Sequence, residues 1–505
     1  DAFATLSVVD LLVDDDLTVA GDLDVDGTTN LDVVDIDGAV NFAADVTLAD
    51  GADLITASAG TSNFRAGVNA GNSIQSGGNY NVAVGDEAGT AITTGTNNTI
   101  IGSSAGDSLT DADYNTSLGF GSLGFDQLGS RTTAIGYRAL GTQRFTSATD
   151  SYNTAVGYDA GLEITTGRFN NLIGGLAGDA LTDGSANVAI GYGALSSDTR
   201  GLSSVAIGHA ALESQNFTSS TDSFNTAVGK SAGTLVSTGV KNTLIGALAG
   251  DALNTGTRNV SLGYGSLSSD TKGSRSVAIG TDALFTQNFT SATDAYNTAV
   301  GHFAGGSVTT GVKNTIIGGL AGDAITTADE NTLVGYVAGS SLTTGEDNVL
   351  IGSLTGDALT EGKDNVAVGR NSLSADTKGR QSVAIGSSAL SAQNFTTLTD
   401  TYNTAVGSSA GTAVTTGVRN TFIGGLAGDA LTAGLDNVAM GKSALSAETS
   451  GARSVAIGSN SLTAQNVGSG AAVYNTAVGY DAGASVTTGV QNVLIGGLAG
   501  DALTD

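Results

Sequence analysis

Residues 403–419 read NTAVGSSAGTAVTTGVR, and residue 420 begins another copy of the same pattern. The copies are 17 residues apart and follow one another from about Asn63 to the end of the 505-residue chain. When each copy is numbered from its Asn, position 4 is aliphatic or Met and position 5 is Gly in every copy from Asn81 onward. A period this short and regular is typical of solenoids and fibres rather than of globular enzymes.

Each copy is predicted to form one coil of a β-roll. Gly at two or three positions of every copy argues against a helix. Two short segments rich in Thr, Val and Ile, separated by Gly corners, predict the order strand, turn, strand, turn. We expect the position-4 side chain, such as Val406, to point into the core. We expect Gly407 to take a positive φ or to lie against another backbone, and Asn403 to join an amide ladder between coils.

The copies also form a longer period. From Asn81 to Asn153 there are 72 residues, made of three copies of 17 and one of 21. The same sum recurs from Asn153, from Asn225 and from Asn403. Counting from Asn63 gives 25 copies, so residues 63–505 are predicted to be a repeat shaft. At the spacing of neighbouring strands, 25 stacked coils would extend about 120 Å.

The four extra residues of each longer copy fall at the same place and bring aromatic residues with them. A regular insertion in a solenoid predicts a loop on one face. The aromatic rings either cover the shaft or a neighbouring chain, or they contact a receptor, since exposed aromatic residues make good contact residues. The candidate receptor-contact residues are Phe145, Tyr152, Phe217, Phe224, Phe289, Tyr296, Phe395, Tyr402 and Tyr474.

Residues 1–62 differ from the shaft and are predicted to form an acidic β-helical or attachment segment. Residues 17–27 read LTVAGDLDVDG, in which apolar and acidic residues largely alternate as in a strand. Asp22, Asp24 and Asp26, followed by a Gly, match the opening of a calcium-binding loop. Val33 stands where such a loop requires a carboxylate, so we interpret the acids as strand decoration, with weak calcium binding between chains as the alternative. No other cofactor is predicted.

Composition limits the partners. The formal net charge is -29, from 48 acidic and 19 basic residues, and such a surface repels nucleic acid and anionic lipid. No apolar run approaches the ~20 residues that cross a bilayer, and Cys is absent. We therefore predict a protein that binds no nucleic acid and inserts no segment of this chain into a membrane; the absence of Cys is compatible with an extracellular location.

Catalytic residues are not predicted. His209 and His302 are the two histidines, and both occupy position 6 of their copies, a variable position. A nucleophile, base and orienting group cannot be assembled from them without further partners. A glycan-cleaving tailspike, the least favoured alternative, would need paired acids about 5–10 Å apart. The recurring acids stand one per copy at position 10 and are interpreted as solvating the shaft: Asp179, Asp251, Asp323, Asp357, Asp429 and Asp501.

Residues 382–386 and 454–458, both SVAIG, resemble the head repeats of trimeric autotransporter adhesins. The NTAVGxxAG version, with TTG between copies, looks like the repeats of phage tail fibres and of bacterial tail-fibre-domain surface proteins. The resemblance covers nearly the whole chain. It implies a parallel homotrimer of left-handed β-rolls that attaches to a cell-surface or host receptor, either a glycan or a protein.

Two placements follow from the resemblance, a bacterial extracellular adhesin or filament and a phage tail fibre for host recognition. The 17-residue copy is longer than the usual adhesin-head unit, and the alternating N-terminal segment looks like tail-fibre sequence. The chain starts at Asp1 rather than Met, and its last copy stops at position 14, so we expect the natural chain to be longer. The location is predicted to be the cell surface or the virion tail.

Overall fold

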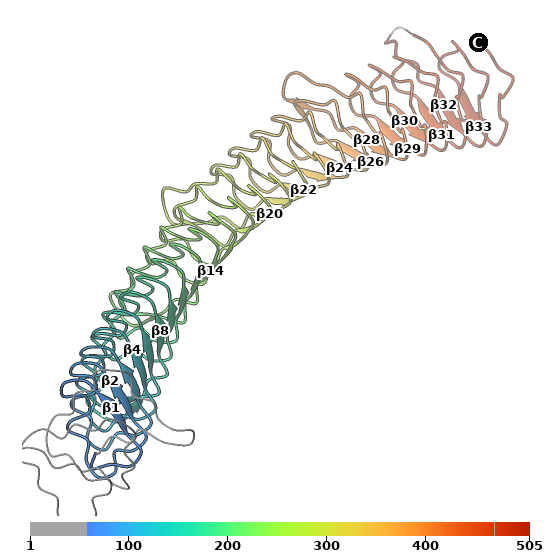
Figure 1. The fold of residues 1–505 in the computed structure, drawn as a ribbon. Helices are drawn as coiled ribbons and strands as arrows, with labels where there is room; N and C mark the ends of the chain where they lie inside the picture. The colour runs from blue at the N-terminus through green and yellow to red at the C-terminus, as the bar shows by residue number, and fades with distance from the viewer. Residues whose placement is uncertain (1–57, 469) are drawn as a thin grey trace, which may run out of the picture. The chain divides into compact units, whose positions relative to one another are not determined.

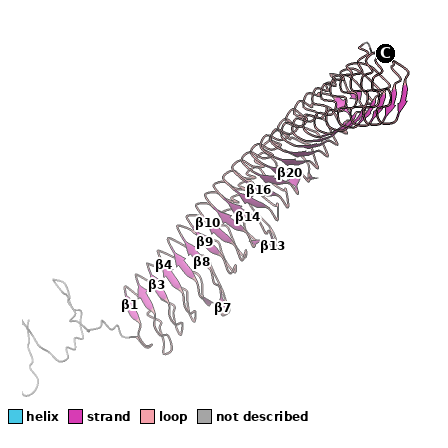
Figure 2. Ribbon diagram, turned by 90° about the vertical axis from the view of Figure 1, so that its right-hand side faces the viewer, coloured by secondary structure: helices cyan, strands magenta, loops and turns pink. Residues whose placement is uncertain are grey.

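The computed structural model describes residues 58–468 and 470–505. The chain divides into two compact units, Asp1–Leu54 and Ile55–Asp505, and every described residue lies in the second. That unit is a parallel β-solenoid of stacked coils, in which the described residues form strands and turns but no helix (Figures 1 and 2). The predicted all-β solenoid and its 17-residue repeat are confirmed. Asp22, Asp24 and Asp26 lie outside the described residues, as does most of the predicted segment 1–62.

Each coil contributes one three-residue strand, at positions 2–4, to a single 25-stranded sheet. Every strand pairs in parallel with the corresponding strand of the next coil; in one such pair Ala405 lies opposite Phe422. The 25 strands match the 25 copies counted in the sequence. The strands are β1 (Phe64–Ala66), β2 (Val82–Val84), β3 (Thr99–Ile101), β4 (Thr116–Leu118), β6 (Thr133–Ile135), β8 (Thr154–Val156), β9 (Asn171–Ile173), β10 (Val188–Ile190), β12 (Val205–Ile207), β14 (Thr226–Val228), β15 (Thr243–Ile245), β16 (Val260–Leu262), β18 (Val277–Ile279), β20 (Thr298–Val300), β21 (Thr315–Ile317), β22 (Thr332–Val334), β23 (Val349–Ile351), β24 (Val366–Val368), β26 (Val383–Ile385), β28 (Thr404–Val406), β29 (Thr421–Ile423), β30 (Val438–Met440), β31 (Val455–Ile457), β32 (Thr476–Val478) and β33 (Val493–Ile495).

The second strand predicted for every coil does not form. Positions 12–14 bend instead, although their backbone still bonds coil to coil, as from Thr415 N to Thr432 O at 2.9 Å. The nearby Gly corner leaves too short an extended run for a ladder of several bonds. Two-residue strands appear beside four of the insertions. They are β5 (Gly129–Ser130) with β7 (Thr149–Asp150), β11 (Gly201–Leu202) with β13 (Thr221–Asp222), β17 (Gly273–Ser274) with β19 (Thr293–Asp294), and β25 (Gly379–Arg380) with β27 (Thr399–Asp400).

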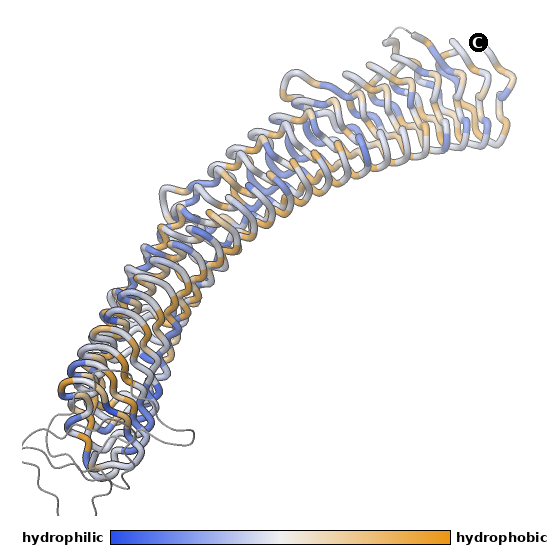
Figure 3. Tube along the Cα trace, in the orientation of Figure 1, coloured by the Kyte–Doolittle hydropathy of each residue, from blue (hydrophilic) through white to orange (hydrophobic). Residues whose placement is uncertain are grey.

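The position-4 side chains face outward, so the prediction that they fill the core is wrong. Ile385 is 38% exposed, whereas its neighbour Ala384 at position 3 is fully buried. Alternation within a strand puts positions 2 and 4 on one face and position 3 on the other. The coil is narrow, and the side chains at positions 8, 9 and 12 already fill much of it, so mostly Ala, Leu or Ile faces inward. In Figure 3 hydrophobic residues recur along the edge of the tube that carries the strands.

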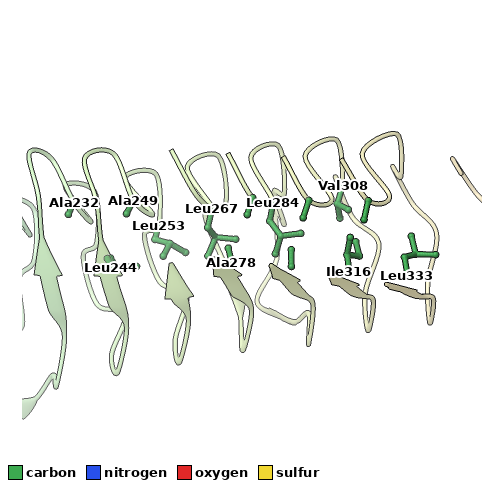
Figure 4. Close-up of a cluster of buried hydrophobic side chains, with 14 of the residues drawn as sticks. Ala232, Leu244, Ala249, Leu253, Leu267, Ala278, Leu284, Val308, Ile316 and Leu333 are labelled. Atoms are coloured by element: carbon green, nitrogen blue, oxygen red, sulfur yellow. The ribbon is translucent and has the colours of Figure 1, made fainter. Parts of the chain in front are cut away.

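The core is a single file of side chains in which positions 9 and 12 exchange roles. Most coils have Gly at position 9 and a buried aliphatic residue at position 12, as in Gly411 and Val414. The remaining coils have a buried Leu at position 9, such as Leu123 and Leu140, and a polar residue at position 12. Either choice puts one large aliphatic side chain into the same narrow interior (Figure 4). Close packing explains the exchange, because both together would overfill the coil.

The Asn residues at position 1 form the predicted ladder. Asn403 Oδ1 accepts a hydrogen bond of 2.9 Å from the backbone N–H of Asn420, one coil further on. Asn420 Nδ2 in turn donates 2.9 Å to the backbone oxygen of Gly434. Both Asn side chains are fully buried, so these bonds satisfy amides that would otherwise be costly inside the solenoid.

The position-5 glycines show both predicted properties. Gly407 has φ +143°, and a Cβ on it would lie 2.6 Å from the backbone of Gly424 in the next coil. No side chain fits where two backbones approach so closely. The invariant Gly therefore lets successive coils stack at the end of each strand.

Candidate functional site

A buried polar cluster fixes each insertion to the solenoid. The coil before each insertion, here called an acid coil, has Leu at position 9 and Asp or Glu at position 12; the coil with the insertion has Gln at position 12. In the first pair, Gln143 Nε2 donates 2.6 Å to Asp126 Oδ2, and Gln143 Oε1 accepts 2.8 Å from Asn153 Nδ2. The other carboxylate oxygen of Asp126 accepts from the backbone N–H groups of Gly129 and Phe145. All three polar side chains are buried. The equivalent clusters are Asp198–Gln215–Asn225, Asp270–Gln287–Asn297, Asp376–Gln393–Asn403 and Glu448–Gln465–Asn475.

Burial raises the pKa of the carboxyl groups of Asp126, Asp270 and Asp376 above the ordinary value of 3.8. Desolvation disfavours the charged form, and the hydrogen bonds from Gln and backbone N–H groups oppose it only in part. Both oxygens of the Asp126 carboxylate accept hydrogen bonds from the coil that carries the insertion, from Gln143 and from the backbone of Phe145, so the acid ties the insertion to the preceding coil.

The first aromatic residue of each insertion points inward. Phe145, Phe217, Phe289 and Phe395 are only 5–8% exposed. The backbone N–H of each Phe donates to the carboxylate of the acid coil; the bond from Phe145 N to Asp126 Oδ1 is 3.0 Å. Of the two interpretations made from the sequence, covering of the shaft describes these four rings. Their rings leave little surface for a receptor in this arrangement.

The second aromatic residue points outward. Tyr152, Phe224, Tyr296, Tyr402 and Tyr474 are 49–55% exposed. Each stands just before the Asn that opens the next coil, at the corner that position 17 occupies in the shorter copies. Receptor contact through these five rings stays a prediction.

The same corner carries further residues that the insertion pattern did not reveal. We call the outward residues that precede each position-1 residue the corner ladder; its other exposed aromatic members are Tyr80, Tyr114 and Phe169. Arg131 lies between two of the rings, 5.0 Å from the Tyr114 centroid and 5.8 Å from that of Tyr152. Tyr152 stacks on Phe169 at 5.8 Å. The sequence signal for these residues is their place in the 17-residue frame.

Charged members of the corner ladder pair in the same manner. Lys313 Nζ lies 2.6 Å from Glu330 Oε1, and Arg419 Nε lies 2.6 Å from Asp436 Oδ1, one coil apart in each case. These exposed ion pairs contribute little stability. The ion pairs instead restrict the conformations of these long side chains, so that the corner ladder presents them at a regular spacing.

A second outward row runs along position 6, just after the position-5 Gly. Phe120, Tyr137 and Tyr158 stack in succession, with ring centroids 5.6 and 5.3 Å apart. His209 stacks on Tyr192 at 5.7 Å, and His302 is exposed as well. The two histidines are thus surface residues on separate coils, as the sequence indicated.

Five of the six acids predicted at position 10 are not simply solvated, contrary to the sequence interpretation, whereas Asp501 in the last coil is exposed. Asp179, Asp251, Asp323, Asp357 and Asp429 are half-buried, and each has a buried Oδ1 without a hydrogen-bond partner. Burial raises the pKa of each of these carboxyl groups. These carboxylates are half-buried because coils stack in the solenoid, so the next coil covers a position that would be exposed in an isolated coil.

Among residues 58–468 and 470–505, no group of three or more His, Cys, Asp or Glu residues could hold a metal ion. Within the same ranges, no helix is long and apolar enough to span a membrane. The arrangement offers two outward rows of aromatic and charged side chains beside a sheet.

No known protein family, curated protein or solved structure matches this chain.

Proposed function

We propose that this chain is a non-enzymatic attachment fibre that works outside the cell as a parallel homotrimer. The observation that carries the proposal is the outer face of the 25-stranded sheet. Parallel sheets are normally covered on both faces. Here each coil covers the inner face only, and the outer face carries exposed aliphatic side chains along the described solenoid.

The outer face excludes charge. Its position-2 residues are mainly Thr and Val, and its position-4 residues are almost all Ile, Val or Leu. Ile173, Ile385 and Ile423 are 37–41% exposed. The chain has a formal net charge of -29, yet none of its charged residues stands at position 2 or 4 of a coil from Asn81 onward. A long apolar strip on an otherwise acidic surface is typical of an interface.

Further copies of this chain are the partners that fit such a strip. A second copy presents the same length, spacing and lack of charge, so association buries apolar area without bringing like charges together. The resemblance to adhesin heads and tail fibres supports three copies in parallel. The aromatic rows at position 6 and at the corner ladder flank the strip and supply repeated contacts for a receptor.

A bacterial surface filament and a phage tail fibre share this architecture, and the proposal covers both. Attachment follows from repetition, because each exposed ring of the corner ladder would be presented in three copies. Weak contacts on one rigid support add to a strong one when several are engaged together.

Native mass measurement of the purified chain tests the assembly. We expect three times 49.5 kDa for the natural sequence. The variant Ile385→Lys with Ile423→Lys places charge in the strip and is expected to weaken the trimer, so that a 49.5 kDa species appears at protein concentrations where the natural chain is trimeric, with an unchanged circular dichroism spectrum. Thr397→Lys, on an exposed insertion, is the matched control and keeps the trimer. A natural chain that measures as a monomer contradicts the proposal.

Binding of the fluorescently labelled protein to a panel of bacterial and animal cells tests the attachment. We expect saturable retention on at least one surface, reduced when Tyr152, Tyr296 and Tyr402 are all replaced by Ser. A protein that is retained on no surface, although trimeric, contradicts the attachment function.

A further inference from the structure

One acid coil departs from its sisters at the surface. In residues 115–131, positions 10 and 11 are Gly124 and Phe125. The acid coils that begin at residues 187, 259, 365 and 437 have Ser at position 10 and Ser or Ala at position 11. The departure removes a side chain at one position and adds a large aromatic ring at the next, which serves no purpose in the core.

The departure opens a surface hollow of about 200 Å³ across three coils. Gly121 and Gly124 of the middle coil are among its lining residues. A Cβ added to Gly124 would lie 3.3 Å from Gly121 O and 3.6 Å from Asp107 Oδ1, and a Cβ added to Gly121 would lie 3.7 Å from Arg138 Cγ. The missing side chain at Gly124 thus leaves Asp107 uncovered beside the hollow.

Two aromatic rings line the hollow on the middle coil. Phe120 and Phe125 are 53% and 63% exposed, respectively. Phe120 is held by its stack on Tyr137, whose centroid is 5.6 Å away. Position 6 of the preceding coil is Ser103, so the stack of rings ends at Phe120. A ring fixed in this way binds a flat apolar surface without losing much conformational freedom.

Opposite charges line the other sides. Asp107 and Ser104 belong to the preceding coil, and Arg138 and Thr142 belong to the following coil. Asp107 occupies position 10, where its counterparts such as Asp179 have an Oδ1 buried without a partner. At Asp107 the next coil offers Gly124 instead of a Ser, so its carboxylate borders the hollow.

The chemistry of the lining selects among small ligands. Arg138 would repel a cation and Asp107 would repel an anion, so a ligand of either charge is disfavoured by one side of the hollow. A neutral polyhydroxyl ring satisfies both, since its hydroxyl groups donate to a carboxylate and accept from a guanidinium. The C–H face of such a ring packs on an aromatic side chain.

We propose that this hollow binds one pyranose residue of a glycan, with Phe120 and Phe125 against its apolar face and Asp107 and Arg138 on its hydroxyl groups. The proposal rests on the attachment function, for which it names the class of target. In a trimer the hollow would be present three times, so a weak affinity for one sugar would suffice on a glycan-coated surface.

Saturation-transfer NMR of the full chain with the methyl glycosides of glucose, galactose, mannose and N-acetylglucosamine tests the site. We expect transfer to at least one of them. Gly124→Ser with Phe125→Ser restores the residues of the sister coils at 187 and 259 and should weaken that sugar about tenfold or more. Asp107→Asn should weaken it too, while Tyr264→Ser, an exposed position-6 ring in another coil, should not.

Equal transfer to the natural chain and the Gly124→Ser, Phe125→Ser variant, or transfer to neither, overturns the inference. The cell-binding assay separates this failure from that of attachment. If cells retain both proteins equally, the attachment function stands and the hollow is not the site through which the protein attaches. If the free glycosides reduce cell binding of the natural chain, the target on the cell surface is a glycan. If the glycosides bind in the hollow but do not reduce cell binding, the hollow binds free sugar and its proposed link to attachment is wrong.

Discussion

Gln143 donates its amide N–H to the carboxylate of Asp126 over 2.6 Å, and the two residues stand at the same position of consecutive coils. The pair joins two features that look unrelated in the sequence, an acid inside the core and an insertion one coil later. Gln143 also continues the Asn ladder, because its Oε1 accepts from Asn153 while position 1 of its own coil is Thr132 rather than Asn.

Gln143→Leu is expected to destabilise the coils around it by about 3 kcal/mol, because it leaves a buried carboxylate without its side-chain donor. Stability in a solenoid is largely local, so the measurement is hydrogen–deuterium exchange of residues 115–153. Faster exchange should be confined to these coils. Gln75→Leu, at an exposed position, is the control and should change exchange little. Unchanged exchange in Gln143→Leu would show that the pair does not anchor the insertion.

Gly407→Ala is expected to cost about 3 kcal/mol or more, because its Cβ would lie 2.6 Å from the backbone of Gly424 at φ +143°. The variant should be cleaved near residue 407 in limited proteolysis. Gly425→Ala offers a matched control, since its Cβ would find its nearest atom at 3.8 Å. Equal resistance of the two variants would contradict the close approach of the coils.

The two aromatic residues of one insertion are expected to respond differently. Phe217→Ala removes a ring that is 6% exposed and should cost about 3–5 kcal/mol locally. Phe224→Ala removes a ring that is 52% exposed and should change stability by less than about 0.5 kcal/mol. Thermal unfolding followed by exchange of residues 204–225 measures both. Similar losses for the two variants would place both rings in the same environment.

Mild acidification is expected to stabilise the solenoid. Burial raises the folded-state pKa of Asp126, Asp179, Asp251, Asp323 and Asp357 above 3.8. The folded chain therefore binds more protons than the unfolded chain between 3.8 and the raised values, so stability rises as pH falls through that window. The Tm should therefore rise as the pH is lowered from neutral into the range just above 3.8. Lowered pKa values at the exposed Asp111, Glu330 and Asp436 act in the opposite direction and are screened by solvent.

Asn at the half-buried acids supplies the control for this pH dependence. Asp251→Asn, Asp323→Asn and Asp357→Asn together should reduce the gain in Tm on acidification, because three proton-binding groups are removed. A Tm that falls steadily as the natural chain is acidified from neutral pH toward 3.8 would contradict the assignment.

The repeat predicts the coils, their number, the Asn ladder and the close approach at Gly407, because each depends on which residue recurs at a fixed spacing. It does not decide which side of a three-residue strand faces inward. Ala384 and Ile385 are adjacent in one strand and therefore point to opposite faces, and the sequence alone favours the larger residue, Ile385, for the core. The narrow coil reverses that choice, since the Leu or Val of position 9 or 12 already occupies most of its interior.

The candidate site divides in the same manner. The 17-residue repeat predicts that Tyr152 and Phe145 belong to one insertion. It does not predict which of the two rings is buried, because both are aromatic residues in a polar loop. Burial of Phe145 depends on Asp126, which lies one coil earlier and 19 residues away. Gly at position 9 goes with an aliphatic residue at position 12, and Leu at position 9 goes with a polar residue at position 12. This correlation is visible in the sequence and is the signal that predicts the acid coils.

The exchange at positions 9 and 12 determines where a further coil can be inserted into the solenoid and where it cannot. An acid coil must be followed by its glutamine partner, whereas coils with Gly at position 9 make no such demand on their neighbours. The segment from Asn297 to Asn403 has four coils of the Gly kind before its acid coil, where the other segments between insertions have two. Gene duplication or an engineer can therefore set the distance between successive insertions in steps of one coil, about 4.8 Å each, without disturbing the polar cluster that holds them.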